Sequence, residues 1–142
     1  MPDRATVYLP VSTWISVQAY TNAAFAQRVT ITGEDGKDKV LTGSGEHNTP
    51  MPGGTYGFTT PPASRSPLGW SVVVRVESSG SGGEYRPSQV MLGSCTVMYY
   101  TMSLVVSEDY VDGDWNDAVV QFSWWVPPTL RDARDLHKDH ER

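Results

Sequence analysis

Residues 14–21 read WISVQAYT, and this stretch carries the clearest structural pattern in the sequence. One set of alternate positions holds Ile15, Val17, Ala19 and Thr21, and the other holds Trp14, Ser16, Gln18 and Tyr20. Because successive side chains of a β-strand point to opposite faces, this period of two predicts a strand with one face in a hydrophobic core. Such a strand is typical of a β-sandwich.

Further short segments of β-type composition lie on both sides of this stretch, and turn residues separate them. The chain contains 13 Gly and 10 Pro, which favours a turn-rich all-β fold over a helical one. The predicted strands are 6–9, 14–21, 28–32, 39–42, 55–60, 70–77, 89–92, 95–106 and 118–126. Residues 43–54 and 61–69 are predicted loops, and Asp35 and Gly36 centre a hairpin turn. We therefore predict an antiparallel β-sandwich of about nine strands with Greek-key connections.

The length of 142 residues suits a single domain, which we assign to residues 1–127. Residues 128–142 are rich in charge, so we expect a C-terminal extension that is either a short surface helix or disordered. The formal net charge of -5 and the pI near 5.0 argue against nucleic acid as a partner. Cys95 is the single cysteine, so no disulfide forms within the chain, and its apolar neighbours predict a buried position.

The N-terminal segment lacks the apolar core of a signal peptide. No apolar run reaches the roughly 18 residues that are needed to cross a membrane. We therefore expect synthesis in the cytoplasm and no membrane span. Release from the cell, or display on its surface, by a non-classical route stays open.

Residues 107–120 read SEDYVDGDWNDAVV, and the ten residues from Glu108 to Asp117 hold five carboxylates without one Lys or Arg. Carboxylates this close repel one another, so water and salt, basic side chains or a cation must balance them. Asp112, Asp114 and Asn116 occupy alternate positions, which places their oxygens on one side of an extended chain. Oxygen donors without His or Cys favour calcium. Five negative charges fit two calcium ions better than one, although a single ion stays open.

A calcium pair can serve two purposes, and the residues leave both open. The hydroxyls of a sugar can complete open coordination positions, or the ions can simply stiffen the loop. A helix–loop–helix calcium site is excluded, because its pattern requires Gly at the position of Asp117 and Glu at the position of Ser123. A glycosidase that uses Glu108 is disfavoured, because its two acids flank the substrate instead of following one another along a loop.

The acidic run resembles the calcium loop of the bacterial two-calcium fucose/mannose-binding lectins, whose pattern is close to S-E-D-x-x-D-x-D-[YW]-N-D-A-V-V. The match extends without a gap from Ser107 to Val120. The family's L-P-x-x-T pattern, followed by a calcium-binding Asn, is similar to residues 9–13 and Asn22 here. The resemblance implies a nine-stranded antiparallel sandwich and a protein without catalytic activity that binds sugar through calcium.

The resemblance also implies a role for individual residues. The expected calcium ligands are Asn22, through its backbone oxygen, with Glu108, Asp112, Asp114, Asn116 and Asp117. Asp109 would accept a hydrogen bond from the sugar, and the expected ligand-binding segment is Ala23, Ala24 and Phe25. In the family, Ala at the first position of this segment accompanies mannose and Ser accompanies fucose, so we expect mannose-type ligands. Phe25 stands where the family usually has a small residue.

The resemblance further implies a homodimer or a higher homo-oligomer, and Trp125 is a candidate interface residue. Family chains end shortly after a Trp-Pro pattern, and their terminal carboxylate completes a calcium site of the partner subunit. Here residues 128–142 follow that pattern, which leaves three alternatives open. A tail acid such as Asp132 or Asp135 replaces the terminal carboxylate, the second calcium is lost or has water in place of that ligand, or the dimer differs. We expect a calcium-dependent lectin for mannose- and fucose-containing glycans. The alternative is a structural calcium-binding adhesion or assembly module without sugar binding.

Overall fold

The computed structural model describes residues 2–80, 83–108 and 117–126, and these residues form eight strands and no helix. The strands are β1 (Arg4–Leu9), β2 (Trp14–Gly33), β3 (Asp38–Thr59), β4 (Trp70–Ser78), β5 (Arg86–Pro87), β6 (Gln89–Val97), β7 (Tyr100–Glu108) and β8 (Ala118–Trp125). Every pairing is antiparallel, and the order is β1-β4-β2-β8-β7-β6, with β3 on β2 and β5 on β4. The predicted all-β antiparallel fold is confirmed.

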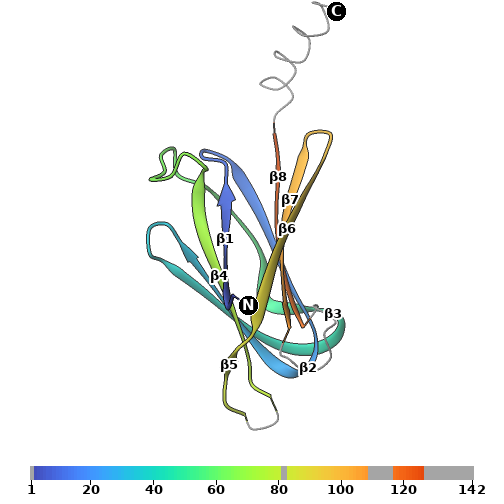
Figure 1. The fold of residues 1–142 in the computed structure, drawn as a ribbon. Helices are drawn as coiled ribbons and strands as arrows, with labels where there is room; N and C mark the ends of the chain where they lie inside the picture. The colour runs from blue at the N-terminus through green and yellow to red at the C-terminus, as the bar shows by residue number, and fades with distance from the viewer. Residues whose placement is uncertain (1, 81–82, 109–116, 127–142) are drawn as a thin grey trace, which may run out of the picture.

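Strand β2 joins the two layers of the sandwich because its two halves pair with different strands (Figure 1). Residues 16–21 pair with β8, whereas residues 27–33 pair with β4. Strand β3 follows β2 along both halves, so this long hairpin bends around the core. At the outer edges, a 3.0 Å hydrogen bond from the Val90 amide to Pro2 O brings β6 next to the start of β1. The two layers are therefore nearly closed into a barrel.

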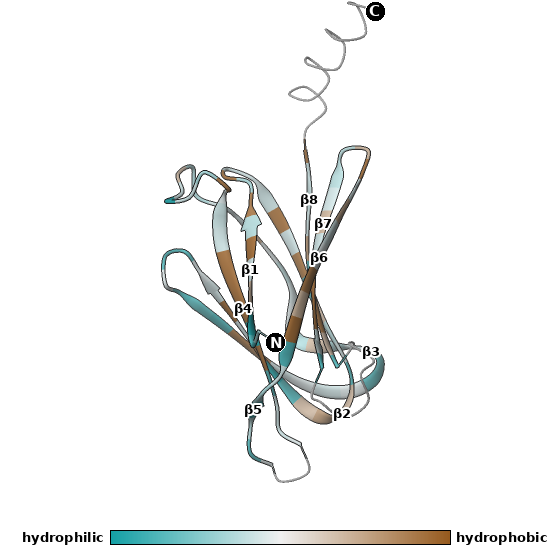
Figure 2. Ribbon diagram, in the orientation of Figure 1, coloured by the Kyte–Doolittle hydropathy of each residue, from teal (hydrophilic) through white to brown (hydrophobic). Residues whose placement is uncertain are grey.

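Alternate residues of these strands meet in one hydrophobic core. Ile15, Val17 and Ala19 of β2 are fully buried, which confirms the strand predicted there. Val74 of β4 and Phe122 of β8 reach the same core from the two layers. Figure 2 shows hydrophobic residues along β1, β2, β4 and β8, and hydrophilic residues at the turn from β2 to β3. No helix in the described part of the chain has the length and apolar character needed to cross a membrane.

The prediction of a loop at residues 43–54 is wrong, because these residues belong to β3. Their backbone pairs with β2 in spite of their Gly and Pro content. Left-handed backbone conformations at Gly45, His47 and Asn48 accommodate the irregular register. The predicted strands 14–21 and 28–32 are likewise one strand, β2. These two mergers remove two strands and the unpredicted short strand β5 adds one, so the described residues form eight strands and not nine.

The predicted strand 95–106 is also wrong, because it contains a hairpin turn. Strand β6 ends at Val97 and β7 begins at Tyr100, and Met98 between them has a φ of 56°. No Gly, Asn or Pro marks this turn, so the apolar pattern reads as continuous. Cys95 is exposed rather than buried, because it lies on the edge strand β6, where every residue after Val90 is exposed.

Candidate functional site

The acidic run leaves the sheet at the end of β7 and returns at the start of β8, and its two ends are hydrogen-bonded to each other. The Asp117 amide donates to Ser107 O at 3.1 Å, and the Ala118 amide donates to Ser107 Oγ at 2.9 Å. Strand β2 joins them, because the Asn22 amide donates to Asp117 O at 3.0 Å. We call this junction of three strands the acidic neck and define it by Asn22, Ser107, Glu108 and Asp117.

Two carboxylates are buried in the acidic neck. Glu108 and Asp117 are only 3% and 4% exposed. A buried carboxylate is costly unless hydrogen bonds, a cation or a metal balance its charge, and both residues interact further within the chain. Asp117 is bonded to the backbone of Asn22 and of Ser107, and Glu108 follows Ser107 in β7, so two residues with hard oxygen donors are buried at this junction. This set of donors suits calcium rather than a softer metal.

The side chain of Asn22 holds an irregular part of β3. Its Nδ2 donates to Asn48 Oδ1 at 2.9 Å, and its Oδ1 accepts from the Asn48 amide at 2.7 Å. Residues 46–48 stand opposite this single position of β2, because Thr21 pairs with Thr49 and the next pair is Ala23 with Gly45. The side-chain amide of Asn22 is therefore committed to β3, and the expected role in calcium binding rests on the backbone oxygen. No local signal in the sequence indicates the partnership with Asn48.

The expected ligand-binding segment, Ala23 to Phe25, follows Asn22 directly and lies beside the acidic neck. Ala23 is buried, whereas Ala24 is exposed and Phe25 is 40% exposed. Strand β2 changes partners in this region, since residues 16–21 pair with β8 and residues 27–33 with β4. The segment thus presents two side chains to solvent at the point where the two layers meet.

The buried side chain of Gln27 supports this segment by a hydrogen bond to the backbone of Phe25, and this contact is visible only in the structure. Its side chain is 0% exposed, and Nε2 donates to Phe25 O at 3.3 Å and to Ser78 Oγ at 3.1 Å. The Ser79 amide donates to Ala26 O at 2.9 Å and adds a second anchor. A polar residue within an otherwise alternating strand is the one sequence signal that could have indicated Gln27.

The expected residues Asp109, Asp112, Asp114 and Asn116 lie outside the described residues, as does the extension 128–142. Their roles stay predictions. Within the described ranges, no group of three or more His, Cys, Asp or Glu side chains is placed to hold a metal. The reason is that three of the six expected ligands belong to residues 109–116, which the structure does not describe. Of the other three, Asn22 and Asp117 are joined by a backbone hydrogen bond, and Glu108 follows Ser107, whose carbonyl accepts from the Asp117 amide.

The sequence profile of Fucose-binding lectin II (PA-IIL) matches residues 7–126, which cover the second half of β1 and every later strand. The chain belongs to this family. A fucose-binding lectin II protein is a carbohydrate-binding protein and has no catalytic activity, so the prediction of a lectin rather than an enzyme is confirmed. No curated protein sequence matches the chain.

Three solved structures show the same fold as this fucose-binding lectin II chain. A high-affinity mannose-binding lectin of Ralstonia solanacearum has a TM-score of 0.68 at 23% identity, over 86% of this chain and 96% of that chain. A Chromobacterium violaceum lectin solved with α-methyl-fucoside has a TM-score of 0.64 at 23% identity, over 86% and 96%. The C-terminal domain of a Burkholderia cenocepacia lectin has a TM-score of 0.68 at 25% identity, over 89% and 100%.

Proposed function

We propose that this lectin binds mannose- and fucose-containing glycans at the acidic neck in a calcium-dependent manner, and that it prefers mannose. The observation that carries the proposal is the burial of the carboxylates of Glu108 and Asp117 at a junction where the Asn22 amide bonds to Asp117 O, with the exposed side chains of Ala24 and Phe25 following Asn22 along β2. Membership of the fucose-binding lectin II family supports sugar binding. The similar structures include a mannose-binding lectin and a lectin in complex with α-methyl-fucoside.

The chain itself would contribute a rigid set of oxygen donors. Backbone hydrogen bonds between β2, β7 and β8 hold the two buried carboxylates in place before any ligand arrives. Burial excludes water and strengthens the attraction between these carboxylates and a cation. The expected ligands in this arrangement are Asn22, Glu108, Asp112, Asp114, Asn116 and Asp117. Two bound calcium ions, or one as a minimum, would supply open coordination positions to the hydroxyls of the sugar.

Selectivity among sugars would come from the segment after Asn22. Ala23 offers no hydroxyl to the ligand, which favours mannose over fucose in our proposal. Phe25 adds an exposed aromatic ring that can pack on the apolar face of a pyranose. Asp109 would accept a hydrogen bond from a sugar hydroxyl that also contacts calcium.

Isothermal titration calorimetry tests the proposal. Methyl α-mannoside should bind more tightly than methyl α-fucoside in millimolar calcium, and excess chelator should abolish both signals. Asp117→Asn should weaken binding at least tenfold. Asp38→Asn serves as the matched control, because Asp38 lies at the distant turn from β2 to β3 and its bond from Thr32 Oγ1 can persist. An absence of heat from both sugars in calcium would refute the proposal.

The second candidate is a structural calcium-binding module without sugar binding. The exposed ring of Phe25 favours it, because a bulky side chain beside the acidic neck narrows access for a sugar. This candidate predicts that calcium raises the melting temperature while neither methyl glycoside releases heat. The two functions are therefore separated by the same pair of measurements.

We also propose that the lectin assembles as a homodimer or a higher homo-oligomer. Sedimentation velocity at several protein concentrations, with calcium and with chelator, measures the mass of the particle. A monomer at all concentrations would contradict this part of the proposal without affecting sugar binding at the acidic neck.

A further inference from the structure

Strand β3 is irregular where it passes Asn22 of the acidic neck. Residues 46–48 stand opposite this single residue of β2. His47 and Asn48 have φ angles of 65° and 55°, so two successive residues other than glycine adopt the left-handed backbone conformation. Such a conformation costs free energy, persists only where the surrounding structure holds it, and is often found beside a ligand site. We call residues 45–49 the β3 bulge.

Side-chain hydrogen bonds from β2 hold the β3 bulge. Thr21 is fully buried, and its Oγ1 donates to Gly45 O at 2.9 Å. Asn22 adds two bonds, because its Nδ2 donates to Asn48 Oδ1 at 2.9 Å and its Oδ1 accepts from the Asn48 amide at 2.7 Å. This contact is reciprocal, since it restrains the side chain of Asn22 as much as it restrains the bulge. We call it the Asn22–Asn48 clamp.

The backbone of Asn22 is held from the other edge of β2, by β8. Its amide donates to Asp117 O at 3.0 Å. The N–H and C=O groups of one residue point to the same edge of a β-strand, so Asn22 O also faces Asp117 and the end of the acidic run. In a regular antiparallel pair the Asp117 amide would donate to this oxygen, whereas here it donates to Ser107 O at 3.1 Å. The direction of Asn22 O thus fits its expected role as a calcium ligand.

We propose that Asn48 is a positioning residue for calcium and sugar binding, an inference that rests on the proposed function of the acidic neck. Asn22 is bonded to β3 through its side chain and to β8 through its amide, so its peptide group cannot rotate without breaking one of these contacts. The Asn22–Asn48 clamp thereby fixes the direction of Asn22 O and of residues 23–25, which follow it. A ligand group that is ordered in advance loses less conformational entropy on binding, so the clamp raises the affinity for calcium.

Asparagine also suits a left-handed backbone by itself, and glycine suits it better. Asn48→Gly separates these two roles, because it keeps the backbone conformation and the amide donor but removes Oδ1, the acceptor of the bond from Asn22 Nδ2. If Asn48 served the backbone alone, this variant would bind calcium at least as well as the unmodified chain.

Calorimetric titration of calcium into the full chain, without sugar, tests the clamp. Asn48→Gly should weaken calcium binding about fivefold, which corresponds to the net worth of one neutral hydrogen bond. Asn22→Ala keeps the backbone oxygen but removes both bonds to Asn48, so it should weaken calcium binding at least as much. The double variant should bind no more weakly than Asn22→Ala alone, because the contact is then already broken. His47→Gly is the matched control: it relieves the left-handed backbone next to Asn48, leaves the clamp in place and should bind calcium like the unmodified chain.

Amide hydrogen exchange in excess chelator tests the same contact without metal. The Asn22 amide, which is bonded to Asp117 O, should exchange several-fold faster in Asn48→Gly than in His47→Gly. Equal exchange rates in the two variants would overturn the proposal, because Asn48 would then not restrain the backbone of Asn22.

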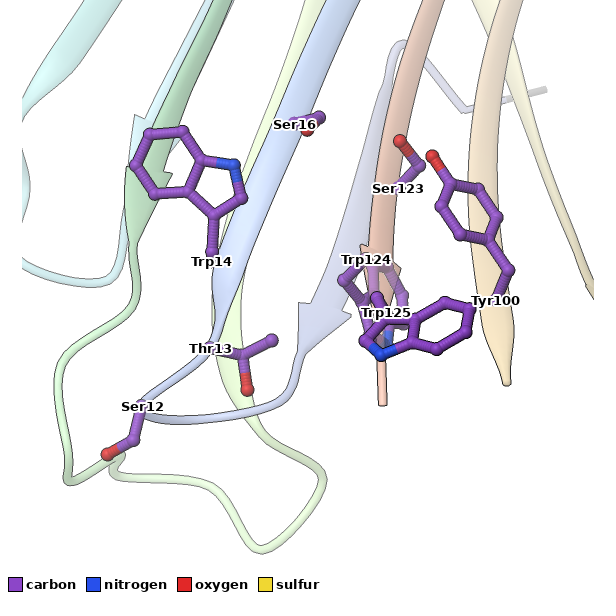
Figure 3. Close-up of a pocket in the computed structure, with 8 residues that line it drawn as sticks. All are labelled: Ser12, Thr13, Trp14, Ser16, Tyr100, Ser123, Trp124 and Trp125. Atoms are coloured by element: carbon purple, nitrogen blue, oxygen red, sulfur yellow. The ribbon is translucent and has the colours of Figure 1, made fainter. Parts of the chain in front are cut away.

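Sedimentation velocity separates the clamp from an effect on assembly. Trp125, the candidate interface residue, lies in a groove that Trp14 and Ser16 of β2 also line (Figure 3). Ser16 and Asn22 are about 20 Å apart along that strand, so each variant should have the same mass as the unmodified chain. A loss of calcium affinity that occurs only together with a change in mass would overturn the proposal and place the effect at the contact between subunits.

The calcium titration also separates this inference from the proposed function. If the unmodified chain binds calcium and methyl α-mannoside but Asn48→Gly binds calcium equally well, the positioning role of Asn48 is wrong and the proposed function stands. A double variant that is weaker than Asn22→Ala alone would likewise overturn the clamp, because the two residues would then act independently. An unmodified chain that binds neither calcium nor sugar would overturn both.

Discussion

Replacement of Gln27 by Leu or by Ala tests how the buried polar side chain beneath Phe25 contributes to stability and to binding. Gln27 donates two hydrogen bonds, to Phe25 O and to Ser78 Oγ. Its Oε1 is buried and has no hydrogen-bond partner among the described residues. The side chain therefore combines two favourable bonds with one unfavourable buried oxygen.

The two substitutions should have very different costs. Gln27→Leu removes two neutral hydrogen bonds, each worth about 1 kcal/mol, and also removes an unsatisfied buried oxygen that costs about 1–3 kcal/mol. Its net effect on the free energy of unfolding should therefore lie within about 1 kcal/mol of zero. Gln27→Ala removes the same groups and leaves a cavity in a fully buried position, so it should destabilise the protein by about 2–4 kcal/mol.

Urea denaturation followed by tryptophan fluorescence measures both free energies, and calorimetry with methyl α-mannoside measures binding. Both variants release the carbonyl of Phe25, so both should bind the sugar about tenfold more weakly, equivalent to about 1.4 kcal/mol. Gln121→Leu on β8 is the matched control and should change neither quantity by more than about 0.5 kcal/mol. A loss of 3 kcal/mol or more in Gln27→Leu would refute the assignment of a costly buried oxygen. Unchanged binding in a folded variant would refute the positioning of residues 23–26 by Gln27.

Three further predictions follow from the same structure. Hydrogen bonds from Ser64 and from the Arg65 amide lower the pKa of Glu34. The ionised carboxylate therefore contributes stability above pH about 4.5, and this stability is lost as the pH falls through the pKa of the folded state. Glu34→Gln should reduce the drop in melting temperature between pH 6 and pH 3.5, and an unchanged drop would contradict this. Millimolar calcium should raise the melting temperature measured by differential scanning calorimetry, because it neutralises the buried carboxylates of the acidic neck, and Asp117→Asn should reduce that rise. Phe122→Ala should lower the free energy of unfolding in urea by about 3–5 kcal/mol, because Phe122 is fully buried where the two layers meet. A decrease of less than about 1 kcal/mol in this free energy would show that the core is not closed there.

Much of the fold is readable in local patterns. The alternation in residues 14–21 predicts the buried face of β2, and Ile15, Val17 and Ala19 are indeed fully buried. The predicted turn at Asp35 and Gly36 is confirmed between β2 and β3. These features depend on neighbours one to three residues apart, so the sequence contains all the information that they require.

Other features depend on partners far away in the chain. Residues 43–54 look like a loop because Gly and Pro dominate them, yet pairing with β2 makes them part of a strand. Cys95 looks buried because its neighbours are apolar, yet its position on an edge strand exposes it. The composition of a segment does not specify which strand lies beside it, and that neighbour decides both hydrogen bonding and burial.

The same division applies to the candidate site. The density of carboxylates in residues 108–117 and the absence of His and Cys among them already indicate a calcium-type site, because ligand chemistry depends on residue type and spacing. The junction of Asn22 with Asp117 and Ser107 appears only when β2, β7 and β8 lie side by side, and the bond from Gln27 to Ser78 appears only when β2 lies beside β4. Residues about 100 positions apart become neighbours only through sheet pairing, and it is this pairing that turns separate chemical groups into sites.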